Sequence, residues 1–321
     1  MTASLCQLIR AASQPLKPIP TGQDNSLRPL PGIRAVLFDI YGTLFVSGSG
    51  DIGTTTESAR GRAVGEAFCE MFEKEQGDAM DAFSAFAGVQ EKLGQPDERA
   101  ALVDAVGRAV VGRFVDAIQG DHSRKRAAGV EFPEVDIVDI WRNVVATLAG
   151  AETAGSGIDF EQLAVRYELL TNPVWPMPGL AETLDRLSAA DRLLGIISNA
   201  QFYTPLLFPA LLDRSLDDLA FDPEMQYYSY RFGEAKPGET LYRHAVSGLA
   251  AHGITPAEAL YVGNDMLNDI TPASRCGFRT ALFAGDRRSL RLREDDDRVA
   301  GVLPDLVVTD LATLPDCILK T

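Results

Sequence analysis

The segment RAVLFDIYGTLF, residues 34–45, joins an apolar run to a polar turn. Ala35–Phe38 is wholly apolar and stops at Asp39, a pattern typical of a strand buried on both faces of a parallel sheet. Gly42 permits the tight turn that frees the Asp39 carboxylate. Because ligands of parallel α/β sheets bind just beyond the carboxyl ends of the strands, we expect Asp39 to lie in a ligand site.

Similar apolar runs recur later in the chain, at residues 193–197, 259–262, 280–283 and 306–308. Helical patterns lie between them, at 178–189, 238–251 and 269–275. Strands that alternate with helices through short connections indicate an α/β architecture. The sequence therefore predicts a doubly wound parallel sheet, built from residues 34–45 and 173–321.

A long insertion, residues 46–172, separates the first strand from the rest of this sheet. It opens with the glycine-rich linker GSGDIGTTT, residues 48–56, and apolar residues then return at helical spacing over 63–72, 102–114 and 135–148. That spacing predicts at least three amphipathic helices and hence a helical domain.

Residues 1–33 precede the first strand as a separate N-terminal extension. A short helix is expected around Leu5, Leu8 and Ile9, and five prolines follow by residue 31. Because proline disfavours regular structure, we expect the rest of the extension to lie on the surface or to be partly disordered.

The chain is acidic, with a formal net charge of −15 over 321 residues. Nucleic acids and anionic membranes are polyanions, so this charge argues against both as partners. No apolar run approaches the roughly twenty residues of a membrane span, and the N-terminus lacks the pattern of a signal peptide. The four cysteines are dispersed without a CxxC pair, which favours free thiols in a reducing compartment. We therefore expect a cytoplasmic protein. Because the chain is acidic, an enzyme of this kind needs a local cationic site to bind a small anionic substrate. The sequence carries no signal for oligomeric state.

Polar side chains follow the predicted strands at four places. They are residues 39–44, then Ser198 and Asn199, then Lys236 in the loop 234–238, then Asp265 and Asp269 in the segment 263–269. Here the sequence resembles the haloacid dehalogenase-like (HAD) superfamily, because FDIYGTLF, IISN, AKPG and VGNDMLND are similar to its four motifs in family order. The resemblance covers the core from residue 34 to about 285. It implies a hydrolase with a Rossmann-like catalytic core, an α-helical cap domain at 46–172, and Asp39 as the nucleophile.

The residues themselves are consistent with that chemistry. A carboxylate is a weak nucleophile, but it can displace at phosphorus or carbon when the target is held in line. The hydroxyls of Thr43 and Ser198 are short donors for a phosphoryl or carboxyl group, and Lys236 supplies the compact positive charge that an anion needs. Tyr41, Gly42 and Asn199 complete the predicted substrate-binding residues.

The fourth motif points to a metal ion. Asp265 and Asp269 are four residues apart, so a helical turn would put both on one face. With Asp39 they gather three carboxylates against one lysine, an imbalance that Mg²⁺ with oxygen ligands would resolve. The resemblance implies binding through Asp39, the carbonyl of Tyr41, and Asp265 or Asp269, of which we prefer Asp265.

Tyr41 departs from the pattern of the phosphatases, which usually carry a second aspartate there as general acid and base. A phenol with a pKa of about 10 is a poor base at neutral pH. Three functions therefore stay open: a Mg²⁺-dependent phosphatase, a 2-haloacid dehalogenase without metal, and a non-enzymatic binding or regulatory protein on the same fold. The acid-rich fourth motif favours the phosphatase.

Overall fold

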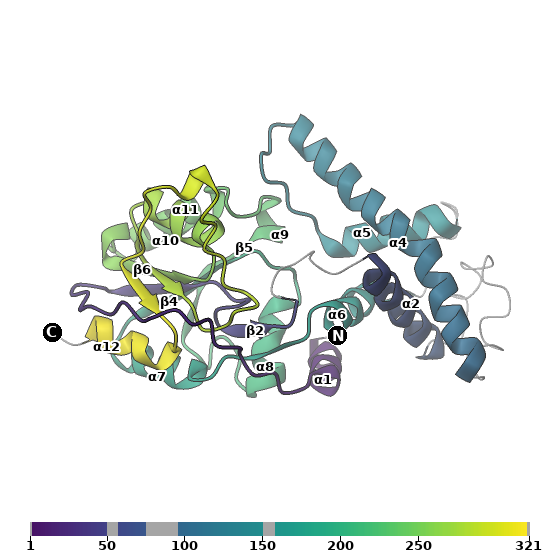
Figure 1. Ribbon diagram of the computed structural model, residues 1–321, viewed down its shortest axis with the longest axis horizontal. Coiled ribbons are helices and arrows are strands. Elements are labelled where there is room, and N and C mark those ends of the chain that lie inside the picture. Colours follow the sequence, from purple (N-terminus) through teal and green to yellow (C-terminus); the bar gives the residue numbers. More distant parts are fainter. Residues whose placement is uncertain (1, 50–56, 75–95, 150–157, 320–321) are drawn as a thin grey trace. The chain divides into compact units, whose positions relative to one another are not determined.

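The computed structural model of the protein describes residues 2–49, 57–74, 96–149 and 158–319. The chain divides into two compact units. One unit combines residues 1–52, 131–134 and 173–321, and the other combines residues 53–130 and 135–172. The first is built on a parallel sheet and the second on helices (Figure 1). Most of the predicted linker 48–56 lies outside the described residues.

Six parallel strands form the main sheet of the first unit, in the order β5-β4-β1-β6-β7-β8. Their bounds are β1 Ala35–Phe38, β4 Leu193–Ser198, β5 Phe221–Tyr228, β6 Ala259–Gly263, β7 Arg279–Phe283 and β8 Leu306–Val308. Every residue of β1 is buried, because β4 and β6 pair with it on both sides. The predicted doubly wound parallel sheet is confirmed.

The carboxyl end of β1 is the point at which the strand order reverses. The chain fills one side of β1 with β4 and β5 and then crosses to fill the other side with β6, β7 and β8. Connections that diverge at such a point leave a crevice beyond the strand ends. Asp39 follows β1 directly, and its N–H donates to the carbonyl of Val262 on β6 over 2.9 Å. The fold therefore places Asp39 at the mouth of this crevice.

The edge strand β5 is not anticipated by the pattern of apolar runs. It carries Asp222, Pro223 and Glu224 near its start, and its pairing with β4 shifts register between Leu194 and Ile196. Proline has no N–H for a ladder and is tolerated at a sheet edge. A strand paired on one side only can therefore hold polar residues that a central strand excludes.

Helices cover both faces of this sheet, with α10 and α11 on one face and α7 and α12 on the other (Figure 1). Their bounds are α7 Leu180–Ala189, α10 Thr240–Ala251, α11 Thr271–Arg275 and α12 Leu314–Leu319. Leu241 and Leu249 of α10 pack with Leu37 of β1 and Tyr261 of β6 in one buried cluster. A single π-helical turn, η4 (Met266–Ile270), precedes α11, where the sequence predicts a continuous helix.

Smaller elements complete the sheet unit. Helix α8 spans Leu207–Leu212 and α9 spans Ser229–Phe232, while β2 (Phe45–Ser47) and β3 (Val174–Pro176) form an antiparallel pair. Strand β2 lies just after β1, before residues 53–172, and β3 lies just after those residues, so the pair holds the two ends of this insertion together. It therefore closes the base of the insertion.

The N-terminal extension lies on the surface of the sheet unit, which is one of the two arrangements expected from the sequence. Helix α1 (Thr2–Ala12) buries Leu5 and Ile9 and contacts α8. The chain then runs without regular secondary structure to Ser26, which exchanges backbone hydrogen bonds with Val307 of β8 over 2.9 and 3.1 Å. The extension thus adds an antiparallel bridge to the β8 edge.

The second unit consists of helices around an aromatic core. Their bounds are α2 Glu57–Lys74, α4 Pro96–Ala127, α5 Ile137–Ala149 and α6 Phe160–Thr171. Trp141 is fully buried, stacks on Phe114 with ring centroids 4.4 Å apart, and contacts Phe68 and Tyr167. Three of these helices match the predicted ones, and α6 is additional. Among the described residues, no helix combines the length and apolar character that crossing a bilayer requires.

Candidate active site

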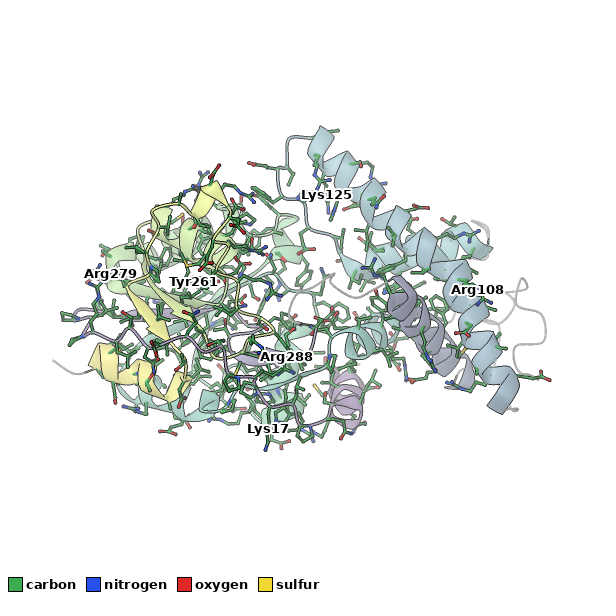
Figure 2. The ribbon with its side chains drawn as sticks, viewed as in Figure 1. Lys17, Arg108, Lys125, Tyr261, Arg279 and Arg288 are labelled. Carbon is green, nitrogen blue, oxygen red and sulfur yellow. The ribbon has the colours of Figure 1, made fainter. Side chains whose placement is uncertain are left out.

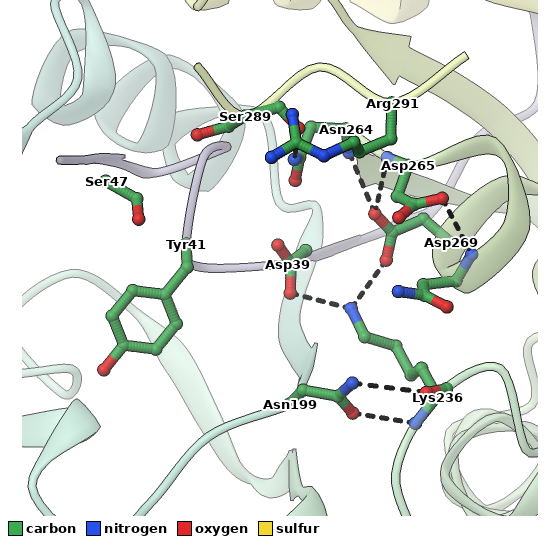
Figure 3. Close-up of a pocket in the computed structure, with 11 residues that line it drawn as sticks. Asp39, Tyr41, Ser47, Asn199, Lys236, Asn264, Asp265, Asp269, Ser289 and Arg291 are labelled. Atoms are coloured by element: carbon green, nitrogen blue, oxygen red, sulfur yellow. Dashed lines mark hydrogen bonds and ion pairs between the residues drawn. The ribbon is translucent and has the colours of Figure 1, made fainter. Parts of the chain in front are cut away.

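A pocket opens at the carboxyl end of β1, within the sheet unit. Of the residues predicted to form the site, those lining it are Asp39, Tyr41, Asn199, Lys236, Asp265 and Asp269 (Figure 3). Four separate segments bring them together: the turn after β1, the end of β4, the loop before α10 and the segment after β6. Gly42, Thr43 and Ser198 lie beside the pocket but do not line it.

The Asp39 carboxylate is buried and held by one of its two oxygens. Oδ1 accepts hydrogen bonds from Ser198 Oγ at 2.9 Å and from Lys236 Nζ at 2.7 Å. Among the described residues, no hydrogen bond reaches Oδ2. The side chain is therefore oriented through Oδ1, and Oδ2 is the oxygen left to meet a ligand.

Lys236 is fully engaged by the protein. Its Nζ donates to Asp39 Oδ1, to Asp269 Oδ1 at 2.6 Å and to the hydroxyl of Tyr261 at 3.1 Å. Burial acts to lower the pKa of Lys236, but the neighbouring carboxylates of Asp269 and Asp39 outweigh it and raise that pKa. An ammonium group has three N–H donors, so the charged lysine spends all three on these partners.

Asn199 holds the main chain of Lys236. Its Oδ1 accepts the N–H of Lys236 at 2.7 Å, and its Nδ2 donates to the carbonyl of Lys236 at 3.3 Å (Figure 3). The side-chain amide of Asn199 thus pairs with both the N–H and the carbonyl of Lys236, as the backbone of an adjacent β-strand would. In this geometry, Asn199 places the lysine.

The carboxylate of Asp269 is saturated with hydrogen bonds. Oδ1 accepts from Lys236 and from the Tyr261 hydroxyl at 3.0 Å, and Oδ2 accepts from the backbone N–H groups of Asn264 and Asp265, both at 2.9 Å. It packs directly on Gly263, where a Cβ would lie 2.4 Å from its Cγ. Burial, opposed by Lys236, raises the pKa of Asp269 to about 6. Since two carboxylate oxygens offer about four acceptor sites, Asp269 has none left for a metal.

Asp265 keeps more acceptor capacity than Asp269. Its Oδ1 accepts from the N–H groups of Leu267 and Asn268 at 2.8 and 3.2 Å, which caps the π-helical turn, and from Arg293 Nε at 3.2 Å. Oδ2 accepts a single hydrogen bond, from Arg293 Nη2 at 2.6 Å. Of the two acids in the fourth motif, Asp265 is therefore the one with an oxygen available at the pocket.

These oxygens form a set that fits a hard divalent cation. Oδ2 of Asp39 and Oδ2 of Asp265 are carboxylate oxygens of residues that line one pocket with Tyr41. The described residues bring no cluster of three or more acidic, histidine or cysteine side chains into metal-binding position. Two carboxylates with a carbonyl and water suit Mg²⁺, which keeps several waters in its shell.

The turn after β1 is fixed by contacts to other segments. Gly42 has a φ of +80°, and a Cβ there would lie 2.4 Å from Cβ of Ser289. Thr43 is fully buried and its Oγ1 donates to Asn264 Oδ1 at 3.1 Å. Both residues hold the turn in place in this structure. A role for either in binding substrate stays a prediction.

The phenol of Tyr41 points away from the Asp39 carboxylate (Figure 3). Its hydroxyl shares a hydrogen bond of 3.0 Å with Thr204 Oγ1. The phenol, at the position where phosphatases usually carry the acid/base residue, is thus directed toward Thr204, which lies just before α8. It does not face the open oxygen of Asp39.

Several residues of the site were not predicted from the sequence. Tyr261 bridges Lys236 and Asp269 from inside β6, while Ser289 and Arg291 line the pocket from the segment after β7, and Arg293 pairs with Asp265. The run SLRLR, residues 289–293, alternates apolar and polar residues as an extended segment does. That alternation, in an acidic chain that needs cations at its site, could have predicted an extended segment that presents its arginines on one side.

The sequence of residues 33–277 matches the family of haloacid dehalogenase-like hydrolases. Among solved structures, a 2-haloacid dehalogenase from Pseudomonas syringae pv. Tomato is similar at 20% identity and a TM-score of 0.50, covering 89% of this chain and 97% of that one. The L-2-haloacid dehalogenase from Xanthobacter autotrophicus and a HAD phosphatase from Thermococcus onnurineus each show 19% identity and a TM-score of 0.43, covering 88% of this chain and 97% of theirs. A search of the curated proteins finds no match. At these identities, the solved structures bear on the fold alone. The family match spans more than half of the chain, and the protein therefore belongs to the haloacid dehalogenase-like hydrolases.

Proposed function

We propose that the protein is a Mg²⁺-dependent phosphatase that attacks a small phosphorylated metabolite with the Asp39 carboxylate. One observation carries the proposal: Oδ2 of Asp39 and Oδ2 of Asp265 keep acceptor capacity at one pocket, whereas their Oδ1 atoms and both oxygens of Asp269 are held by protein donors. A site arranged in this way offers Oδ2 of Asp39 for attack, and it offers the same oxygen together with Oδ2 of Asp265 for a cation.

The proposed reaction has two steps. Asp39 Oδ2 bonds to phosphorus while the bond from phosphorus to the leaving oxygen breaks, and its electron pair passes to that oxygen. Water then attacks the aspartyl phosphate at phosphorus, which restores the carboxylate and releases dihydrogen phosphate. Ser198 and Lys236 hold Oδ1 throughout, so that Oδ2 faces the substrate. An oxygen carries two lone pairs, so one lone pair of Asp39 Oδ2 can attack while the other, with Asp265 and the carbonyl of Tyr41, would hold Mg²⁺, which would supply positive charge to the phosphoryl group.

The orientation of Tyr41 narrows the proposed substrates. Its hydroxyl is engaged by Thr204 and is directed away from Asp39, so it is not placed to protonate a leaving group. General acid catalysis commonly contributes about 10² to 10⁴ in rate. Substrates whose leaving group departs as a stable anion, such as acyl and aryl phosphates, are therefore expected to react faster than alkyl phosphates.

A 2-haloacid dehalogenase is the second candidate, and the same orientation of Tyr41 favours it. In that reaction Asp39 Oδ2 would bond to the carbon that carries the halogen, and the halide would leave with its electron pair. Water would then hydrolyse the resulting ester. Halide needs no proton, so neither a general acid nor a metal is required.

The helical unit and the cell compartment belong to the same proposal. We propose that residues 46–172 form the cap domain of the family and contribute to substrate choice. The four cysteines, Cys6, Cys69, Cys276 and Cys317, are thiols outside any disulfide, which supports action in the reducing cytoplasm. The net charge of −15 supports a small-molecule substrate over a nucleic acid or a membrane surface.

Turnover of a substrate panel with and without metal tests the proposed function. Purified protein is assayed on acyl, aryl and alkyl phosphates and on 2-chloropropionate, with Mg²⁺ or with EDTA. We expect phosphate release that requires Mg²⁺ and disappears in Asp39→Asn, while Asp295→Asn, at an exposed acid, retains it. Chloride release in EDTA would reject the phosphatase in favour of the dehalogenase. A lack of turnover on every substrate would favour a binding protein.

A further inference from the structure

Residues 131–134 of the insertion belong to the sheet unit, whereas the residues on both sides of them belong to the helical unit. We call them the returning segment. The N–H of Glu134 donates to the carbonyl of Gly233 at 3.0 Å. The N–H of Ala235 donates to the carbonyl of Phe132 at 2.7 Å. The returning segment therefore forms a short antiparallel bridge with the loop before α10.

The carboxylate of Glu134 extends this contact to the segment after β4. Its Oε2 accepts a hydrogen bond from the hydroxyl of Ser229 at 2.7 Å, and its Oε1 accepts one from Nε2 of Gln201 at 3.4 Å. Ser229 is fully buried, and its oxygen accepts the N–H of Ala200 at 2.9 Å. The carbonyl of Ala200 lies 3.3 Å from the same hydroxyl, but a carboxylate at shorter distance is the stronger acceptor. Because the one proton of Ser229 points at Glu134, a lone pair is left to hold the N–H of Ala200.

The two contacts of the returning segment meet at Lys236. Ala235 precedes Lys236 in the chain, and Ala200 follows Asn199. The side-chain amide of Asn199 binds the N–H and the carbonyl of Lys236 at 2.7 and 3.3 Å (Figure 3). The ammonium of Lys236 then donates to Asp39 Oδ1 at 2.7 Å. The returning segment thus holds both the loop that carries the lysine and the residue that places it.

We propose that Glu134 is a positioning residue for Lys236. Acting through Ser229 and Asn199, it fixes the lysine against Asp39, so that the insertion completes the catalytic machinery of the unit that it interrupts. A displacement of about 1 Å at a reacting group can cost about a hundredfold in rate. This inference rests on the proposed function only in taking Asp39 as the attacking group.

Acylation of lysines tests the proposal without turnover. The purified full chain is treated with an amine-acylating reagent, and peptide mass spectrometry gives the rate at Lys236 relative to exposed Lys17. In the wild type, Lys236 should react at least about a hundredfold more slowly, because it is buried and its three N–H donors are engaged. Glu134→Ala should raise the rate at Lys236 by about tenfold to a hundredfold, the change in local opening expected when a hydrogen bond to a charged group is lost. Glu134→Gln should restore most of the protection, because its amide oxygen still accepts the Ser229 hydroxyl.

Two further variants tie the effect to the proposed contact. Ser229→Ala removes the hydroxyl that links Glu134 to Ala200. Combining it with Glu134→Ala should add less than about twofold, because both changes break the same link. Glu258→Ala is the control, since Glu258 is also half-buried and accepts a hydroxyl hydrogen bond at 2.8 Å, but at the amino end of β6, away from the pocket. The control should leave the rate at Lys236 within about twofold of the wild type.

Kinetics add a second measurement where a substrate of the panel turns over. In Glu134→Ala, kcat should fall by about tenfold to a hundredfold while KM stays within about threefold. The reason is that the returning segment is not among the residues that line the pocket, so it affects the placement of Asp39 and not the contacts that bind substrate.

The outcomes separate this proposal from the proposed function. Slow acylation of Lys236 in the wild type and fast acylation in Glu134→Ala support the proposal even if no substrate turns over. A thermal unfolding midpoint within a few degrees of the wild type shows that a variant is folded. If Glu134→Ala does not fold, Ser229→Ala decides in its place. The proposal is overturned if Lys236 stays as protected in the folded variant as in the wild type, if Glu134→Gln behaves as Glu134→Ala does, or if Glu258→Ala exposes Lys236 equally.

Discussion

Two segments follow neighbouring strands at the same edge of the sheet and carry opposite charges. The segment after β6, residues 264–269, winds into a π-helical turn and turns Asp265 and Asp269 onto backbone N–H groups. The segment after β7, residues 285–293, is extended through its last part and presents Arg291 and Arg293. We call them the acidic segment and the basic segment. A bridge between Asp265 and Arg291 joins the two.

The comparison corrects the charge balance inferred from sequence. Three carboxylates gathered against one lysine appeared to need a metal for compensation. The basic segment adds two cations, so three acidic side chains face three basic ones around the pocket. Charge alone therefore no longer argues for Mg²⁺. Its support comes instead from the acceptor capacity left on Asp39 and Asp265.

The acidic segment is buried more deeply, so the largest effect on stability is expected there. Asp269→Ala removes the acceptor of four hydrogen bonds, one of them from buried Lys236. Breaking a buried pair of this kind costs about 3–5 kcal/mol. Chemical denaturation monitored by circular dichroism measures the loss in free energy of unfolding. Asp295→Ala, at an exposed acid of the loop 294–297, is the control and should change it by less than about 0.5 kcal/mol. Equal effects of the two variants would contradict the assigned burial.

The contact between the segments is expected to tune the metal site. Arg293→Gln removes the cation that holds the Asp265 carboxylate at 2.6 Å. Losing a residue that orients a metal ligand typically weakens metal affinity by about 10- to 100-fold. Calorimetric titration with Mg²⁺ checks this, with Arg298→Gln as a control at another arginine–aspartate pair. Tighter Mg²⁺ binding by Arg293→Gln would show that the arginine competes with the metal and does not position its ligand.

A buried acid within the basic segment holds that segment in place. Asp286 is 1% exposed, and its carboxylate accepts hydrogen bonds from the N–H groups of Ile19 and Arg288 and from the Arg288 guanidinium. Asp286→Asn turns one acceptor into a donor that faces donors, which costs about 1–3 kcal/mol. Denaturation gives the stability change. An unchanged free energy of unfolding would contradict the contacts assigned to the Asp286 carboxylate.

The smallest effect is expected where the N-terminal extension touches the basic segment and Ala284, the residue before it. Thr21 Oγ1 donates to the carbonyl of Ala284 at 2.8 Å, and the N–H of Arg287 donates to the carbonyl of Ile19 at 2.8 Å. Lys17 and Arg288, labelled in Figure 2, meet through a hydrogen bond from Arg288 Nη2 to the carbonyl of Lys17. Thr21→Ala should lower stability by about 1 kcal/mol, the usual worth of one hydrogen bond. Thr21→Val, which keeps the branched shape, should lose as much; full stability of Thr21→Val would exclude the hydroxyl as the cause.

Sequence patterns predicted the sheet and the meeting of its polar strand ends for a local reason. A buried parallel strand must be an apolar run, and Asp39 and Ser198 stand where such runs stop. The topology then brings Asp39, Ser198 and Lys236 within hydrogen-bond distance. Any chain with these strands in this order would gather the same residues.

The remaining features depend on contacts that no local pattern encodes. Whether Asp265 or Asp269 keeps a free oxygen is decided by which N–H groups the π-helical turn directs at each. The pairing of Arg293 with Asp265 depends on the path of the chain after β7. The proline-rich stretch lacks periodicity, yet Ser26 pairs with β8 through its backbone alone. Pairing through backbone groups alone places no requirement on the side chains, so the sequence pattern does not reveal it.

The bridge between the N-terminal extension and β8 sets an order of events during folding. Asn25 accepts hydrogen bonds from Thr309, 284 positions away in the chain. On the ribosome, Asn25 must wait until Thr309 has been made before these contacts can form. Contacts between such distant positions also form slowly, because a long loop has to close first. The basic segment is therefore expected to reach its final position only after β8 has joined the sheet, because its contacts with the N-terminal extension lie beside the bridge to β8.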